Sequence, residues 1–135
     1  MVDVTGGVIE SVRAPDLGGA ETRAYKESVV LSVPTAAGYV LDVVGQRISA
    51  VALGLRDVRP VRAWQEGGEI REENEARLRL LYRVAKTVAS VYDDATARAF
   101  LRSSSPYLSD SAPVFAIAEG RDEDVVAAMR AFLEA

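Results

Sequence analysis

The amino-acid sequence predicts an all-α protein, and three features of its 135 residues support that prediction. After about residue 34, apolar side chains recur at three- and four-residue steps, which is the spacing of one helix face. Glycines, prolines and short polar residues divide these stretches into pieces of helix length. No stretch alternates apolar and polar residues convincingly, as a half-buried strand does. A chain of this size fits one compact fold, with room for two small sub-domains.

The first 33 residues show no clear periodicity. Glycine pairs at 6–7 and 18–19 and a proline at position 15 interrupt every possible repeat. The apolar run around Val29 to Leu31 is compatible with an extended arm or a short helix. We therefore expect residues 1–33 to form a poorly packed leader or a dimerisation arm.

Residues 34–92 predict four helices joined by glycine turns. A short apolar helix ends near Gly45, and an amphipathic helix follows from Gln46 to the stop at Gly54. Asp57 is placed to cap the third helix, which ends before the next glycine pair. The longest helix is predicted from Glu72 to Tyr92, with glutamates at its positive N-terminal end. We expect Trp64, Tyr82 and Tyr92 to lie on buried faces.

Residues 93–135 predict three shorter helices. The first covers Ala95 to Arg102 and is followed by a serine- and proline-rich loop. The second opens at Pro113 and closes at Gly120, and Asp122 is placed to cap the last helix.

The composition argues against an enzyme. The chain has no Cys and no His, which removes disulfides, thiolate nucleophiles, the usual zinc ligands and the commonest general base. The acidic clusters at 93–94 and 122–124 lie where helices begin, so we interpret them as helix-stabilising charges and not as catalytic carboxylates or metal ligands. We expect no catalytic residue, no metal and no cofactor.

Charge is distributed unevenly along the chain. Gln46 to Lys86 holds nine basic and six acidic residues, whereas Thr87 to Ala135 holds four basic and eight acidic residues. This asymmetry indicates a polyanion site in the middle beside a different interface, although scatter over a solvated surface is the alternative. No stretch approaches the length of a membrane span, and the N-terminus lacks signal-peptide order, so we expect a cytoplasmic protein without membrane contact.

The helices on either side of Gly54 fit a helix-turn-helix. Ala50 is small enough for close helix approach, and Gly54 can adopt the turn conformation. The second helix would then present four side chains suited to DNA: Arg56, Arg59, Arg62 and Gln65. The alternative is an ordinary solvent-facing helix, and the spacing from Gly54 to Trp64 is about one residue longer than in the commonest form of the motif.

Two stretches resemble a known family. Leu41 to Trp64 resembles the helix-turn-helix region of the Xre/MbcA/ParS-like antitoxins, and the tail resembles their toxin-binding domain. That domain carries an aromatic or Leu pair, an Asn-Pro-x-Leu turn, a Pro-x-x-Leu-Leu helix start, a Gly and a closing helix. The corresponding segments stand here in the same order: Phe100-Leu101, Ser105-Pro106-Tyr107-Leu108, Pro113-Val114-Phe115-Ala116-Ile117, Gly120 and Val125 to Leu133. Ser105 replaces the Asn, Ser109-Asp110 stands where glycines are frequent, and Phe115 to Ile117 departs from the leucine pair.

The resemblance implies a helix-turn-helix core over 34–92 followed by a small helical toxin-binding domain over 93–135. It implies an antitoxin that binds and neutralises a cognate RES-domain toxin, an NAD-destroying enzyme, and that binds operator DNA to repress its own operon. Family members commonly form homodimers and place the C-terminal segment over the toxin's active-site entrance. The candidate toxin-binding residues are Tyr107, Pro113, Phe115, Met129, Phe132, Leu133, Glu134 and Ala135.

Several alternatives stay open. The apolar stripe of the last helix could pack on the protein's own long helix instead of a toxin. The chain could also be a helix-turn-helix transcriptional regulator without a toxin partner, or a protein-binding module whose helix-turn-helix never contacts DNA. An enzymatic role ranks last.

Overall fold

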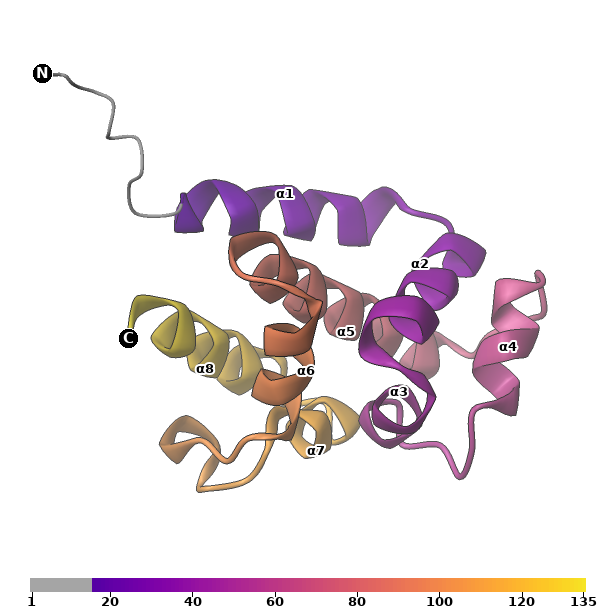
Figure 1. Ribbon diagram of the computed structural model, residues 1–135. Coiled ribbons are helices and arrows are strands. Elements are labelled where there is room, and N and C mark those ends of the chain that lie inside the picture. Colours follow the sequence, from indigo (N-terminus) through magenta and orange to yellow (C-terminus); the bar gives the residue numbers. More distant parts are fainter. Residues whose placement is uncertain (1–15) are drawn as a thin grey trace, which may run out of the picture.

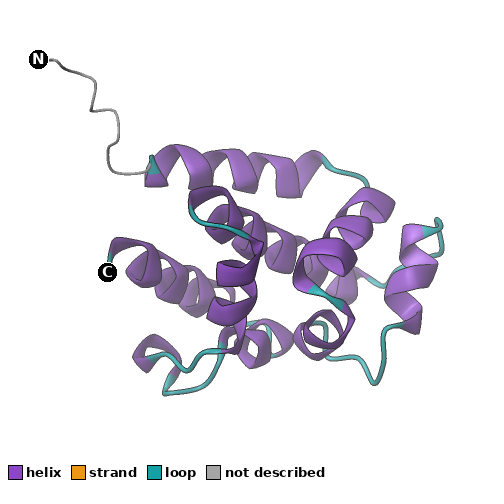
Figure 2. Cartoon of the chain, in the orientation of Figure 1, coloured by secondary structure: helices purple, strands orange, loops and turns teal. Residues whose placement is uncertain are grey.

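The computed structural model describes residues 16–135, and its regular structure is helical throughout this range (Figure 2). The α-helices are α1 (Leu17–Val30), α2 (Val33–Tyr39), α3 (Gln46–Ala52), α4 (Arg59–Gln65), α5 (Glu72–Val91), α6 (Asp94–Arg102), α7 (Pro113–Ala118) and α8 (Asp122–Glu134). A π-helical turn, η2 (Val40–Val44), and a 3-10 turn, η3 (Pro106–Leu108), complete the list. The predicted all-α class is confirmed. None of the helices in this range has the length and apolar character needed to cross a bilayer.

Helix α5 is the centre of the fold. It packs against α1, α2, α6, α7 and α8, which surround it in Figure 1. Leu78, Leu81, Val84 and Val88 lie on its inner side and are fully buried. Their spacing of three and four residues is the periodicity that predicted this helix, and its predicted bounds hold to within one residue.

The expectation of a poorly packed arm is wrong for the described part of residues 1–33. Helix α1 is a regular helix that lies along α5, with Asp16 as its cap: the Gly19 N–H donates to Asp16 Oδ1 at 2.9 Å. Its buried side chains are small, namely Ala20, Ala24 and Ser28. Residues 1–15 of the expected arm lie outside the described range.

The helices on either side of Gly54 are present, but the tight corner expected between them is not. Gly45 (φ 97°) and Gly54 (φ 68°) both have left-handed backbone conformations, so the predicted glycine stops are confirmed. Residues 53–58 separate α3 from α4. Helix α3 packs mainly on α7, and α4 packs on α2. The two helices are therefore held by different neighbours.

The C-terminal helices begin close to the predicted positions. Asp93 caps α6, since the Thr96 N–H donates to its Oδ1 at 2.7 Å. Pro113 opens α7, and Gly120 (φ 75°) follows its end. Asp122 does not cap α8; it lies in the first turn, where its charge favours the helix N-terminus.

Candidate functional site

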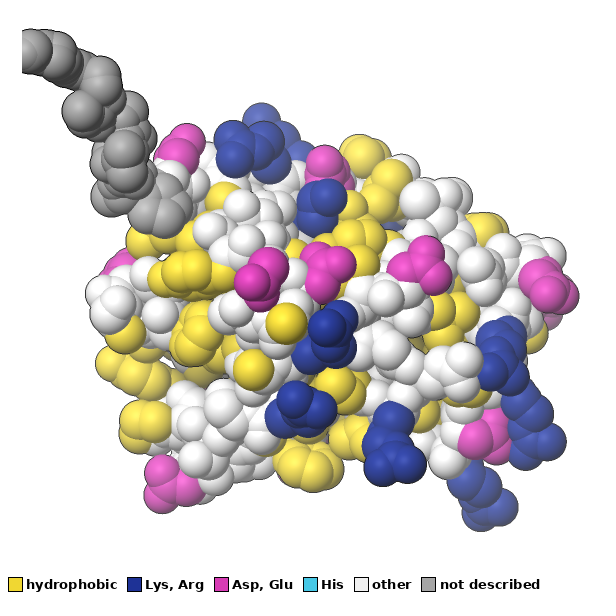
Figure 3. Space-filling view, in the orientation of Figure 1, with side chains coloured by type: hydrophobic (Ala, Val, Ile, Leu, Met, Phe, Trp, Pro, Cys, Tyr) yellow, Lys and Arg dark blue, Asp and Glu magenta, His cyan; other side chains and the backbone are white. Residues whose placement is uncertain are grey.

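Helix α4 and the loop before it form an exposed basic surface. Arg56, Arg59, Arg62 and Gln65, the predicted DNA-binding residues, are all exposed. Figure 3 shows Lys and Arg side chains gathered over α4 and this loop, and we call the region the α4 basic surface. Val61 and Trp64 lie on the opposite side of α4 and are buried. The buried side attaches α4 to the rest of the fold, and the polar side remains free for a partner.

Asp57 neutralises part of this surface. Arg59 Nη2 lies 2.6 Å from Asp57 Oδ2, and the Arg59 Nε and backbone N–H both donate to Asp57 Oδ1. The hydrogen bond from the Arg59 side chain is the main cause that lowers the pKa of Asp57 to about 2. Within residues 16–135, Arg56 and Arg62 have no ion-pair partner. Arg56 and Arg62 are thus the more available cations.

The predicted toxin-binding residues divide into exposed and buried groups. Tyr107, Phe115, Glu134 and Ala135 are exposed, and Phe132 is partly buried. Pro113, Met129 and Leu133 are buried within the fold. Their assignment to a partner surface is therefore wrong, and most of the apolar stripe of α8 packs on the protein's own core.

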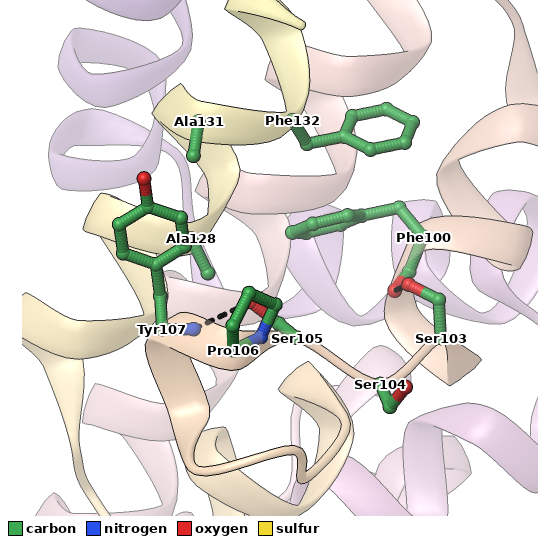
Figure 4. A pocket seen from close by; sticks show the side chains of 9 residues that line it. All are labelled: Phe100, Ser103, Ser104, Ser105, Pro106, Tyr107, Ala128, Ala131 and Phe132. Carbon is green, nitrogen blue, oxygen red and sulfur yellow. Dashed lines mark hydrogen bonds between the residues drawn. The ribbon is translucent and has the colours of Figure 1, made fainter.

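Tyr107 and Phe132 border the same cleft, which lies between the loop after α6 and helix α8 (Figure 4). Its volume is about 210 Å³, smaller than the ~300–1,000 Å³ typical of small-molecule sites. The rings of Phe100 and Phe132 lie 4.8 Å apart between centroids, and the Tyr92 ring lies 6.2 Å from that of Phe132. Tyr92 is 49% exposed, so its predicted burial is wrong, whereas that of Trp64 and Tyr82 is confirmed. The cleft suits one or two side chains of a partner.

The loop over residues 105–111 is closed by its own hydrogen bonds. The Ser105 N–H donates to the Ser111 carbonyl at 3.0 Å, and the Asp110 N–H donates to the Ser105 carbonyl at 2.8 Å. The Tyr107 N–H also donates to the Ser105 hydroxyl oxygen at 3.2 Å (Figure 4). Ser109 (φ 56°) and Asp110 (φ 64°) adopt left-handed conformations that favour glycine. The closed loop leaves the Tyr107 side chain 59% exposed.

Phe115 lies in a different place from Tyr107. It borders a groove between α3 and α7, which we call the α3–α7 groove. Two arginines that sequence reasoning did not single out, Arg47 and Arg102, line the same groove. The packing of α3 on α7 brings these residues together. No local pattern marks such a site, because its members come from distant parts of the chain.

Comparisons with known proteins give no match: no protein-family model, no curated protein and no solved structure is significantly similar to this chain.

Proposed function

We propose that this chain is an antitoxin that binds and neutralises a cognate RES-domain, NAD-degrading toxin in the cytoplasm. In this proposal residues 93–135 bind the toxin, and residues 34–92 bind operator DNA through α4 and the loop before it. The protein acts as a homodimer. The two regions share one core, since α5 packs against both α6 and α8.

The geometry of the 105–111 loop is the observation that carries the proposal. The resemblance to the Xre/MbcA/ParS-like antitoxins includes an Asn-Pro-x-Leu turn followed by frequent glycines, where this chain has Ser105 and Ser109-Asp110. Ser109 and Asp110 have the positive φ values that glycine adopts without strain. The Ser105 hydroxyl accepts a hydrogen bond from the N–H two residues on, as an Asn side chain does in the equivalent turn. The substituted residues support the proposal, because they form a turn that Asn and Gly would also allow.

Tyr107 supports a protein partner for this loop. Its ring is exposed on a closed loop and borders the cleft that Phe100 and Phe132 line. Exposed tyrosines on well-ordered backbone often contribute strongly to protein–protein affinity, because they bury a large area with little loss of side-chain entropy.

Co-expression with a RES-domain toxin tests the proposal. We expect rescue of growth and a stable complex on gel filtration. Tyr107→Ala should weaken the complex about ten-fold or more, because it removes an aromatic anchor. Tyr25→Ala, at an exposed tyrosine of α1, is the matched control and should leave affinity nearly unchanged. No complex and no rescue by the wild-type chain contradicts the proposal.

Gel shifts with the chain's own promoter test the DNA-binding part. Arg56→Ala and Arg62→Ala should each weaken binding and reduce the salt slope by about 0.9, the value for one lost phosphate contact. Asp57→Asn should strengthen binding, because it releases Arg59 from its ion pair. If the chain is a transcriptional regulator without a toxin partner, it should bind DNA but not the toxin. If it is a protein-binding module whose helix-turn-helix never contacts DNA, it should bind the toxin but not DNA.

A further inference from the structure

The α3–α7 groove combines an apolar floor with a basic rim. Its volume is about 220 Å³. The described residues that line it are Ile48, Val51, Ala112, Val114 and Phe115, with Arg47 and Arg102, and no acidic residue is among them. Figure 3 shows basic side chains beside hydrophobic ones on the face over α3, α6 and α7.

The side chain of Phe115 is exposed beside the groove. Its neighbours Val114 and Ala116 are buried and hold α7 in the fold, while Phe115 is 53% exposed. Ile48 and Val51 of α3 continue this apolar surface with half-buried side chains one helical turn apart. A phenylalanine beside such a surface leaves apolar area in water that a partner side chain could cover.

The groove continues along α3 into a second hollow. That hollow shares Arg47 and Val51 with the first and adds the partly buried Leu55, the exposed Arg56 and Asp57, whose carboxylate is already paired with Arg59. The two hollows share lining residues, so one segment of a partner can contact both. Arginines therefore stand at intervals along an apolar strip.

The charges on the rim determine the chemistry of the occupant. Within the part of the chain that the structure describes, Arg47 and Arg102 have no ion-pair partner. A nucleic-acid backbone could satisfy these guanidinium groups but would leave Phe115 and its apolar neighbours facing phosphates. A protein helix with an apolar stripe flanked by carboxylates satisfies both the floor and the rim.

We propose that the α3–α7 groove binds an acidic amphipathic helix of the toxin, with an apolar side chain of that helix against Phe115. This inference rests on the proposed antitoxin function and adds a second contact surface to the Tyr107 cleft. Carboxylates of the helix pair with Arg47 and Arg102. The toxin is then held at two aromatic anchors, Tyr107 and Phe115.

Affinity measurements with the purified toxin test the groove. Phe115→Ala should weaken binding about ten-fold or more, as loss of an interface aromatic does. The double variant Arg47→Glu/Arg102→Glu should weaken toxin binding by at least a similar factor at about 0.05 M salt. At about 1 M salt the loss should be much smaller, because charges are screened within about 3 Å. Circular dichroism checks that each variant is folded.

The double variant Arg23→Glu/Arg71→Glu is the matched control, because it changes the net charge equally at exposed positions outside the groove. Its affinity should stay close to that of the wild type. If the wild-type chain binds the toxin and the groove variants bind equally well, the groove proposal is wrong and the antitoxin function stands. If the wild-type chain does not bind the toxin, both proposals are wrong.

A photo-crosslinking phenylalanine analogue at position 115 tests the identity of the occupant. In the complex, it should crosslink to a toxin segment in which acidic residues flank an apolar stripe. A crosslink to a segment without acidic residues, to DNA or to a second copy of this chain contradicts the proposal.

Discussion

Helices α1 and α8 both pack on α5, but they are held there by different chemistry. Helix α8 buries large apolar side chains, among them Val125, Met129 and Leu133. Helix α1 buries only two alanines and a serine. The first interface is a volume-filling core, and the second is a close approach of two helices over small residues.

Directed polar contacts hold α1 in place. Arg79 Nη1 donates to the carbonyls of Ser28 (2.9 Å) and Leu31 (2.7 Å) at the C-terminal end of α1. The Tyr82 hydroxyl donates to Glu27 at 3.0 Å. Nearer the start of α1, Glu21 lies 2.6 Å from Arg130 of α8. Polar contacts of this kind each contribute about 0.5–3 kcal/mol, so α1 should open more readily than α8.

The largest expected effect is in α8. Met129→Ala removes a fully buried side chain and should lower the free energy of unfolding by about 2–5 kcal/mol. Urea unfolding followed by circular dichroism measures the loss. Val30→Ala, at an exposed apolar residue of α1, is the control and should change stability by less than about 0.5 kcal/mol. Equal losses in both variants would remove the contrast between the two helices.

A smaller, localised effect is expected from Arg79→Met. The change keeps the apolar stem but leaves the Ser28 and Leu31 carbonyls without their charged donor, which should cost about 1.5–3 kcal/mol. Hydrogen exchange should become faster in α1 and stay unchanged in α8. Arg77→Met provides a control on the same helix, because within residues 16–135 the Arg77 side chain donates a single long hydrogen bond, to Asn74 at 3.5 Å. Faster exchange in α8 as well would show that α1 is not an independent unit.

The small-residue contact can be tested by overpacking. Ala24 is buried between α1 and α5, so Ala24→Leu should force the helices apart and cost about 1–3 kcal/mol. Thermal unfolding should show a lower Tm for this variant. Ala127→Leu makes the same change at an exposed position of α8 and should leave the Tm nearly unchanged. An unchanged Tm for Ala24→Leu would mean that the contact between α1 and α5 tolerates a large side chain at position 24.

The smallest effect concerns Glu21 and is visible in its pH dependence. The hydrogen bond from Arg130 is the main cause that lowers the pKa of Glu21 below the ordinary value of 4.5. Its stabilisation, below about 1 kcal/mol, is present above that value and is lost as the pH falls through the lowered pKa. Glu21→Gln should lower the free energy of unfolding at pH 7. Between pH 7 and pH 3 its free energy of unfolding, measured with urea, should fall by less than that of the wild type. Glu66→Gln, which changes an exposed carboxylate in the same way, is the control.

The same contrast explains which helices the sequence could predict. The ends of α5 and α7 were predictable because apolar periodicity, Pro113 and the terminal glycines are local signals. Helix α1 was not, because its buried alanines and serine give no hydrophobic stripe. Its hydrogen-bonding partners on α5 lie between 48 and 62 residues away. Contacts at such separations leave no pattern in a single sequence.

The candidate sites, like the helices, were predictable only where a local sequence pattern marks them. The exposure of Arg59 and Arg62 follows from the polar face of a short helix. The burial of Met129 could not be inferred, because an apolar stripe serves an internal core or a partner equally well. The role of Arg102 in the α3–α7 groove depends on how α3 and α7 meet, which only the tertiary structure defines.

Trp64 is the single tryptophan of the chain and is buried where α4 packs on the fold, away from α1 and α8. The fluorescence of Trp64 therefore reports on the packing of α4 against α2. A fluorescence transition that coincides with the loss of ellipticity would identify one cooperative unit, and an earlier transition would show that this packing is lost first.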